Sequence, residues 1–178
     1  MNIDTLKQLM PSYAKDIKLN LSAVLSEQGA PGLILNQIAS ISLASAFSTK
    51  NNTIITEILT AAREHISDNE LEASKLAATL MAMNNIYYRY VHLASSKEVT
   101  SLPAKLRMQG IMNPGVDSID FELYSLAVSA INGCGMCMDS HTKQLLKHSV
   151  KPEAIQSSIR IASVIHAASQ AVSIEKSL

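Results

Sequence analysis

The sequence has no tryptophan and few aromatic, glycine or proline residues. Aromatic side chains make up 4% of the 178 residues, and there are only 6 glycines and 5 prolines. Disordered and fibrous proteins contain far more glycine and proline, so we expect this chain to fold into a globular structure. At this length, folding buries about 70% of the surface of the unfolded chain, so the core needs no metal or disulfide framework.

An excess of charge of either sign is also absent. Lysine and arginine together number 15, and aspartate and glutamate together number 15 as well. Proteins that bind nucleic acids usually have a basic excess or a basic stripe. Binding to an anionic membrane surface likewise uses clusters of basic residues. We therefore expect neither a nucleic acid nor a membrane as a partner.

Targeting and membrane-spanning segments are not evident. Residues 1–7 have neither the basic region nor the apolar region of a secretory signal. The longest uncharged stretch, from Gln28 to Thr49, is long enough to span a bilayer, but it contains Gly29, Pro31 and four serines. It therefore predicts a turn followed by a core helix. The two cysteines are too few for a secreted disulfide scaffold, so we expect a soluble, cytoplasmic protein.

The pattern of apolar residues predicts an all-α protein. Apolar residues recur with a helical period between sparse breakers, and no short segment alternates like a strand. Ser67 and Glu70 have the spacing of a capping box ahead of a long apolar pattern. The predicted helices cover residues 2–10, 12–27, 32–48, 51–66, 69–96, 118–132, 134–148 and 152–175. We expect residues 1–178 to form one compact multi-helix domain, with an N-terminal half (1–96), a linker (97–117) and a catalytic C-terminal half (118–178).

Short matches between the halves suggest an internal duplication of a helical unit. Residues 42–44 and residues 125–127 both read Ser-Leu-Ala, and residues 75–77 resemble residues 160–162 at nearly the same separation. Alanine-rich helices also align by chance, so the duplication is a hypothesis. In such a repeat only the second copy carries cysteines, and Asn51 lies near the equivalent place in the first.

Both cysteines lie in one C-x-x-C motif, Cys134 and Cys137, directly after Asn132-Gly133. Because Asn-Gly commonly turns the chain, the motif is predicted to open a helix. A thiol there faces unpaired backbone N–H groups and the positive end of the helix dipole, which favour the thiolate. In such motifs thiol pKa values fall to roughly 3.5–7.5, against about 8.5 for a free cysteine. The pair can also close a disulfide within one turn, which is the basic requirement for dithiol redox chemistry.

His141 and Glu122 extend this candidate site. Cys134, Cys137 and His141 stand at i, i+3 and i+7, so they share one helix face. If the chain reverses at Asn132-Gly133, Glu122 lies about 15 Å back along one helix and His141 about 12 Å out along the next. The two side chains then reach the same level. A carboxylate beside His141 would orient the ring and raise its basicity toward the Cys137 thiol.

Each of these residues also has an alternative interpretation. The cysteines could be half of a zinc site with His141 and Glu122 as further ligands, although a second Cys/His pair is missing. They could also be inert core residues. Glu122 could be a helix-end charge or a satisfied buried ion, and His141 an ordinary core or surface histidine. The four residues together favour redox chemistry. Four methionines are interpreted as gap-fillers in the core: Met81, Met83, Met108 and Met112.

The stretch from Phe121 to Cys134, followed by Cys137 and His141, resembles the active-site stretch of alkyl hydroperoxide reductase D. This is an all-helical family within the carboxymuconolactone decarboxylase-like superfamily. The specific element is the spacing E-x11-C-x2-C-x3-H, since a lone C-x-x-C would identify no family. The likeness covers nearly the whole chain and includes residues 11–20, 83–89, 106–108 and 113–115.

The resemblance implies a thiol-dependent, lipoyl-dependent peroxidase of antioxidant defence that reduces a partner peroxiredoxin, AhpC. It implies electrons from dihydrolipoamide on a lipoylated dihydrolipoamide acyltransferase, kept reduced by dihydrolipoamide dehydrogenase and NADH. By the family pattern, Cys137 is the thiolate that meets peroxide, Cys134 is the other half of the disulfide, and Glu122 and His141 relay protons. Some members have a second histidine between the cysteines, where this chain has Met136.

The resemblance also implies a homotrimer and redox chemistry without a bound metal, flavin or haem. Residues 69–96 carry more apolar surface than one small domain easily covers, which agrees with an oligomer. Two other functions remain open at this point. One is a non-redox, carboxymuconolactone decarboxylase-like enzyme, which would need anion-binding groups and no paired thiols. The other is a binding protein stabilised by zinc.

Overall fold

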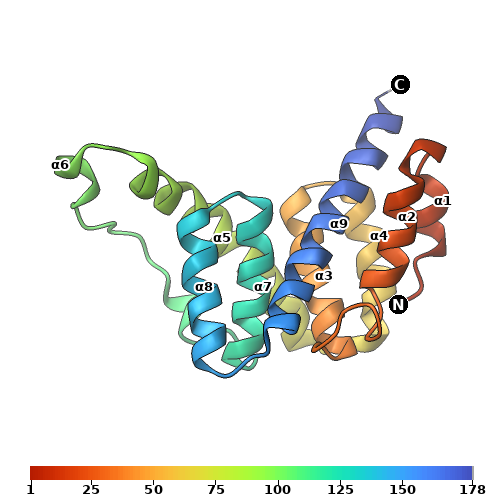
Figure 1. The fold of residues 1–178 in the computed structure, drawn as a ribbon, viewed down its shortest axis with the longest axis horizontal. Coiled ribbons are helices and arrows are strands. Elements are labelled where there is room, and N and C mark those ends of the chain that lie inside the picture. Colours follow the sequence, from red (N-terminus) through yellow and green to blue (C-terminus); the bar gives the residue numbers. More distant parts are fainter. Residues whose placement is uncertain (178) are drawn as a thin grey trace.

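The computed structural model describes residues 1–177, and within this range every regular element is helical (Figure 1). The prediction of an all-α fold is therefore confirmed. The α-helices are α1 (Asp4–Leu9), α2 (Lys15–Val24), α3 (Leu35–Thr49), α4 (Asn52–Ala62), α5 (Asp68–Leu93), α6 (Lys97–Thr100), α7 (Ser118–Ile131), α8 (Gly135–Lys147) and α9 (Pro152–Lys176). Three short 3-10 helices are η1 (Ser12–Ala14), η2 (Arg63–His65) and η3 (Gln109–Ile111).

The eight predicted helices are all present, with differences at their ends. The segment predicted as 12–27 begins as η1 and ends as a helix at Val24, before Ser26 accepts turn hydrogen bonds from Gly29 and Ala30. The segment predicted as 51–66 ends as an α-helix at Ala62 and tightens into η2. The predicted linker, residues 97–117, contains α6 and η3, which are too short to give a periodic pattern.

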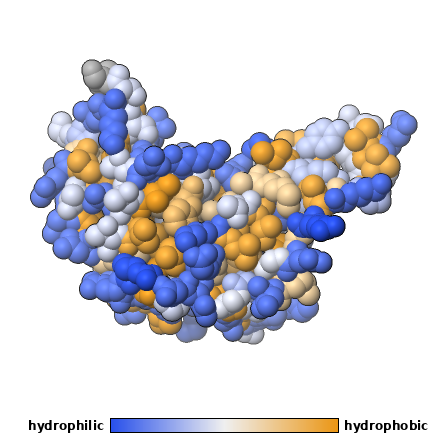
Figure 2. All heavy atoms as spheres, turned by 180° about the vertical axis from the view of Figure 1, so that it is seen from behind, coloured by the Kyte–Doolittle hydropathy of each residue, from blue (hydrophilic) through white to orange (hydrophobic). Residues whose placement is uncertain are grey.

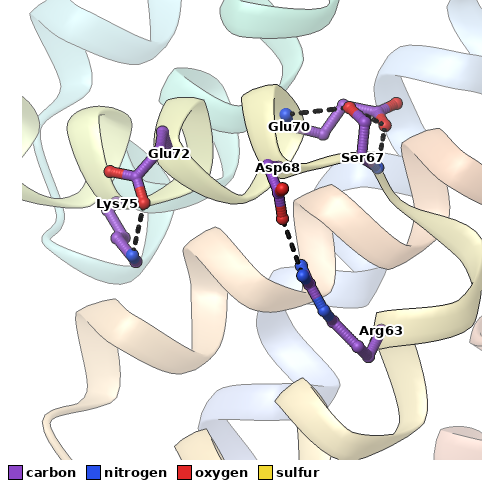
Figure 3. A network of polar contacts seen from close by, with 6 residues as sticks. All are labelled: Arg63, Ser67, Asp68, Glu70, Glu72 and Lys75. Atoms are coloured by element: carbon purple, nitrogen blue, oxygen red, sulfur yellow. Dashed lines mark hydrogen bonds and ion pairs between the residues drawn. The ribbon is translucent and has the colours of Figure 1, made fainter.

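The N-terminus of α5 confirms the predicted capping box (Figure 3). The Ser67 hydroxyl accepts a hydrogen bond from the Glu70 N–H (3.2 Å), and the Glu70 carboxylate accepts one from the Ser67 N–H (2.7 Å). The other carboxylate oxygen of Glu70 accepts from Asn36 of α3 (2.7 Å), which ties the two helices together. The ion pair of Arg63 with Asp68 lies on the surface, where such pairs contribute little.

Helices α3 and α7 form the centre of the core. Each packs against the other and against both α5 and α9. Ser42 and Ser45 are fully buried in α3, and their hydroxyls donate to the carbonyls of Ile38 and Ile41 one turn earlier (2.6 and 2.7 Å). The segment from Gln28 to Thr49 is thus a turn followed by a core helix, as predicted. Among residues 1–177, no helix is both long enough and apolar enough to cross a membrane.

The structure contains the same three-helix unit twice, α3–α4–α5 and α7–α8–α9. The first residues of matching helices are 35 and 118, 52 and 135, and 68 and 152, so the offsets are 83, 83 and 84 residues. In each unit the first helix packs against the other two, and it also packs against the third helix of the other unit. Asn51 caps α4 where Cys134 caps α8. This arrangement supports the hypothesis of an internal duplication, with the cysteines in the second copy.

Residues 94–117 form an arm that projects from the body, and α6 lies near the outer tip of this arm (Figure 1). Large apolar side chains on the last turns of α5 and on this arm are exposed, and apolar residues continue from the body toward the arm in Figure 2. The exposed set comprises Ile86, Tyr90, Leu93, Val99, Leu102 and Met112. The arm returns to the body at η3, where Gly110 lies so close to Leu76 that a Cβ would come within 3.0 Å of it. This contact holds Met108 and Ile111 beside α5.

Candidate active site

A tight turn between α7 and α8 places the C-x-x-C motif. Gly133 has a φ of 69°, a left-handed conformation that glycine adopts without strain. The Gly133 N–H donates to the carbonyl of Ala130 (3.1 Å) and the Cys134 N–H to that of Ser129 (3.1 Å). This pair of hydrogen bonds is the Schellman arrangement that ends helices at a glycine. The predicted reversal at Asn132-Gly133 is confirmed, and it makes α7 and α8 an antiparallel hairpin.

Two side chains of α5 form hydrogen bonds to the residues of this turn. Asn85 is buried, accepts a hydrogen bond from the side chain of Asn132 (2.9 Å) and donates one to the hydroxyl of Ser129 (2.9 Å). Arg89, one turn further along α5, donates to the backbone carbonyl of Asn132 (2.7 Å). Both residues lie in the stretch 83–89 that resembles the family, but the sequence predicted no role for either. The available signal was the Asn84-Asn85 pair within an otherwise apolar helical pattern.

The two cysteines are joined in a disulfide, with their Cα atoms 5.3 Å apart. Cys134 is the N-cap of α8, and its sulfur accepts a hydrogen bond from the Cys137 N–H (3.3 Å). Cys134 is 0% exposed, whereas Cys137 is 7% exposed and lines a cavity. A reagent in this cavity therefore meets the sulfur of Cys137 first.

The hairpin brings Glu122 and His141 together as the spacing predicted. Nδ1 of His141 and Oε2 of Glu122 are 2.6 Å apart, and both side chains are largely buried. With the carboxylate at Nδ1, the ring proton is assigned to Nδ1, which leaves Nε2 as the nitrogen that can exchange a proton. His141 and Glu122 line the same cavity as Cys137. The structure thus unites the nucleophile candidate with a histidine and its orienting carboxylate.

The cavity beside Cys137 has a volume of about 470 Å³, and its wall comes from four parts of the chain. The α5 helix contributes Met81, Asn84 and Tyr88, and the segment that returns from the arm contributes Met108 and Ile111. None of these five residues was predicted from the sequence to lie at the site. Met81 and Met108 border the cavity. Met112 is 86% exposed, so the interpretation of Met112 as a gap-filler in the core is wrong.

Two other features bear on the alternatives considered from the sequence. In the described part of the chain, no three His, Cys, Asp or Glu side chains lie together as a metal-ligand set. A larger cavity of about 630 Å³ lies beside Asn85 and Arg89 and includes Lys50 and Lys75. Cysteine, histidine and carboxylate side chains do not line it, so the smaller cavity is the candidate active site.

Comparison with known proteins places the chain in a family. Residues 97–175 match the carboxymuconolactone decarboxylase family. An alkyl hydroperoxide reductase AhpD of Coxiella burnetii is 50% identical over 173 residues, which cover 97% of this chain and 98% of that protein. The chain belongs to the alkyl hydroperoxide reductase D family.

Further members of the alkyl hydroperoxide reductase D family are similarly close. The AhpD of Rhodopseudomonas palustris strain BisB18 is 50% identical over 175 residues, covering 98% of this chain and 94% of that protein. The AhpD of Acidobacterium capsulatum is 45% identical over 176 residues, covering 99% and 95%. The predicted family and the predicted enzyme class, an oxidoreductase, are therefore confirmed.

We predict that Asn85→Leu destabilises the protein by loosening the cysteine turn. The substitution removes the donor to the buried Ser129 hydroxyl and the acceptor for Nδ2 of the partly buried Asn132. An unsatisfied buried group costs about 1–3 kcal/mol. Urea denaturation of the oxidised protein measures the loss. Thr79→Ala on the same helix is the control, because its exposed hydroxyl bonds only its own helix and should change stability by less than about 0.5 kcal/mol. Equal stability of the two variants would contradict the role of Asn85.

Proposed function

We propose that the chain is a lipoyl-dependent alkyl hydroperoxide reductase that uses the Cys134–Cys137 dithiol. It reduces hydroperoxides directly and also reduces a partner peroxiredoxin, AhpC, in the antioxidant defence of the cytoplasm. The observation that carries this proposal is the Cys137 sulfur at a cavity shared with His141, whose ring is bound to Glu122 at 2.6 Å. The printed name of the relatives, alkyl hydroperoxide reductase, supports the same chemistry.

The peroxide step uses Cys137 as the nucleophile. In the reduced protein, Nε2 of His141 takes the proton of the Cys137 thiol, and the Glu122 carboxylate stabilises the resulting imidazolium through Nδ1–H. The thiolate attacks the terminal oxygen of R–O–O–H, the O–O bond breaks, and Cys137 becomes a sulfenic acid. The alkoxide that leaves takes the proton from His141, so the products are an alcohol and the sulfenic acid.

The second step closes the disulfide. The Cys134 thiolate attacks the sulfur of the Cys137 sulfenic acid, and the hydroxyl leaves as water after it takes up a proton. Cys134 is well placed for this attack because its sulfur lies at the helix N-terminus, where the Cys137 N–H donates to it. Two electrons have then passed from the dithiol to the peroxide.

An external dithiol returns the two electrons. Its thiolate attacks the more exposed sulfur, Cys137, and Cys134 leaves as a thiolate stabilised at the start of α8. The second thiol of the donor then releases Cys137 and becomes a cyclic disulfide. Dihydrolipoamide fits this chemistry, carried on a lipoylated dihydrolipoamide acyltransferase and renewed by dihydrolipoamide dehydrogenase and NADH. These steps require no bound cofactor, and the reduced dithiol can pass its electrons to the AhpC disulfide by the same exchange.

Peroxide consumption tests the proposal. The purified protein is mixed with dihydrolipoamide and tert-butyl hydroperoxide, with and without a peroxiredoxin. We expect consumption that depends on the dithiol and rises when the peroxiredoxin is present. A wild-type protein that consumes no peroxide in either mixture would contradict the proposed function.

We predict that Cys134→Ser traps Cys137 as a sulfenic acid, because the resolving thiol is gone. A sulfenic-acid probe followed by mass spectrometry of the peroxide-treated protein detects the trapped residue. The same treatment of the wild type should remove two hydrogens from the chain, as an intramolecular disulfide does. Labelling of Cys134 in Cys137→Ser, with no labelling of Cys137 in Cys134→Ser, would reverse the assignment.

We predict that Glu122→Gln slows the peroxide step at least about tenfold. The amide keeps the shape but removes the charge that supports the His141 imidazolium, and general acid–base contributions run to about 10²–10⁴-fold. His141→Gln should lose a similar factor, and the double variant should be little slower than either single one. Stopped-flow measurement of disulfide formation gives the rates. Strictly additive losses would show that the two side chains act separately.

We predict that the protein is a homotrimer held in part by the arm. The exposed apolar side chains at the end of α5 and on the arm, Leu93 and Leu102 among them, leave an apolar surface that a second copy can cover. Light scattering at micromolar concentration should give the mass of three chains. The double variant Leu93→Glu/Leu102→Glu should lower that mass, whereas the exposed substitution Lys143→Glu on α8 should not. A monomeric wild type would contradict the prediction.

A further inference from the structure

Asn84 is a buried polar residue of the active-site cavity that the proposed steps do not use. The residue is 5% exposed and lines the cavity beside Cys137, His141 and Glu122. Its Oδ1 atom is buried and has no hydrogen-bond partner among residues 1–177. The next residue, Asn85, is buried on the same helix and has both ends of its amide paired. Asn84 differs in that its amide borders a space for a ligand.

An unpaired amide at this position has a free-energy cost. A buried acceptor without a partner destabilises the fold by about 1–3 kcal/mol, and an apolar side chain of the same shape would avoid that cost. The other residues that α5 and the returning arm contribute to this wall are mostly apolar, among them Met81, Met108 and Ile111. Gln144 also lines the cavity, but it is exposed, whereas Asn84 is buried. A buried amide in such a wall is typical of a group that orients a bound ligand.

We propose that the Asn84 amide binds the hydroperoxide group of the substrate, an inference that rests on the proposed function. The amide offers an acceptor, Oδ1, and donors on Nδ2. A hydroperoxide R–O–O–H offers one O–H donor and two acceptor oxygens, so the two groups are complementary. Because Oδ1 is enclosed by protein atoms, the contact is made by Nδ2, which donates to the oxygen bonded to R.

This contact favours the transition state of the peroxide step. When Cys137 attacks the terminal oxygen, the O–O bond breaks and negative charge develops on the oxygen bonded to R. The N–H of Asn84 meets that charge before the proton arrives from His141. Removing one such donor from an oxyanion site typically lowers the rate about 10²–10³-fold. A dithiol has no oxygen equivalent to the one bonded to R, so reduction of the disulfide does not use the hydrogen bond from Asn84.

The two half-reactions, measured separately, test the assignment in Asn84→Leu. We expect single-turnover oxidation of the reduced variant by tert-butyl hydroperoxide to be at least about tenfold slower than in the wild type. Reduction of its disulfide by dihydrolipoamide should stay within about twofold of wild type. Its thermal stability should equal or exceed that of wild type, since the unpaired acceptor is gone. Thr79→Ala, an exposed position of the same helix outside this cavity, is the control and should oxidise at nearly the wild-type rate.

Each other outcome overturns the assignment. A wild-type rate of oxidation in Asn84→Leu would mean that the amide binds no peroxide, and equal slowing of both half-reactions would mean a structural role. If Asn84→Leu does not fold, the smaller Asn84→Ala is measured in its place by the same comparison. A wild-type protein that does not react with the peroxide overturns the proposed function as well, and that result is obtained before any variant is compared.

Discussion

The antiparallel packing of α7 against α8 is the constraint on which the site depends. The turn between the two helices is held by backbone hydrogen bonds from Gly133 and Cys134 to the last turn of α7, and these bonds require the left-handed conformation of Gly133. The same turn makes Cys134 the N-cap of α8 and sets His141 level with Glu122. The position of Cys134 at the start of α8 and the orientation of the His141 ring therefore follow from one local geometry.

The rest of the fold supports that hairpin through the repeat. In the first copy the residue at the cysteine position is Asn51, which caps α4 with its side-chain oxygen where the sulfur of Cys134 caps α8. The first copy thus keeps the helix architecture without the thiol chemistry. Its third helix, α5, supplies Asn85 and Arg89 behind the turn and Asn84 in the cavity wall. The site is built between the two copies, so neither copy alone could form it.

In the proposed mechanism, the difference in burial between Cys134 and Cys137 divides the chemistry between them. Cys137 lies at the cavity, where a peroxide or a donor thiol can approach it, and Cys134 lies behind it in the protein interior. The buried sulfur keeps a hydrogen bond from the α8 backbone, which stabilises negative charge on it as a leaving group. A cavity wall rich in methionine adds flexible apolar surface that suits an organic hydroperoxide.

The sequence alone determined what depends on neighbours along the chain. Helical periodicity predicted the all-α fold, and Ser67 and Glu70 predicted the start of a helix. The contact between Glu122 and His141 was predictable because the two residues lie at similar distances on either side of one chain reversal, and a single hairpin fixes their relative positions. Only the tertiary structure decided the parts of the site that come from α5 and from the returning arm, including Asn84 and Met108. These residues lie far from the cysteines in the chain. Their place depends on how α5 packs against α7 and α8, and apolar periodicity shows that a helix face is buried without showing which partner buries it.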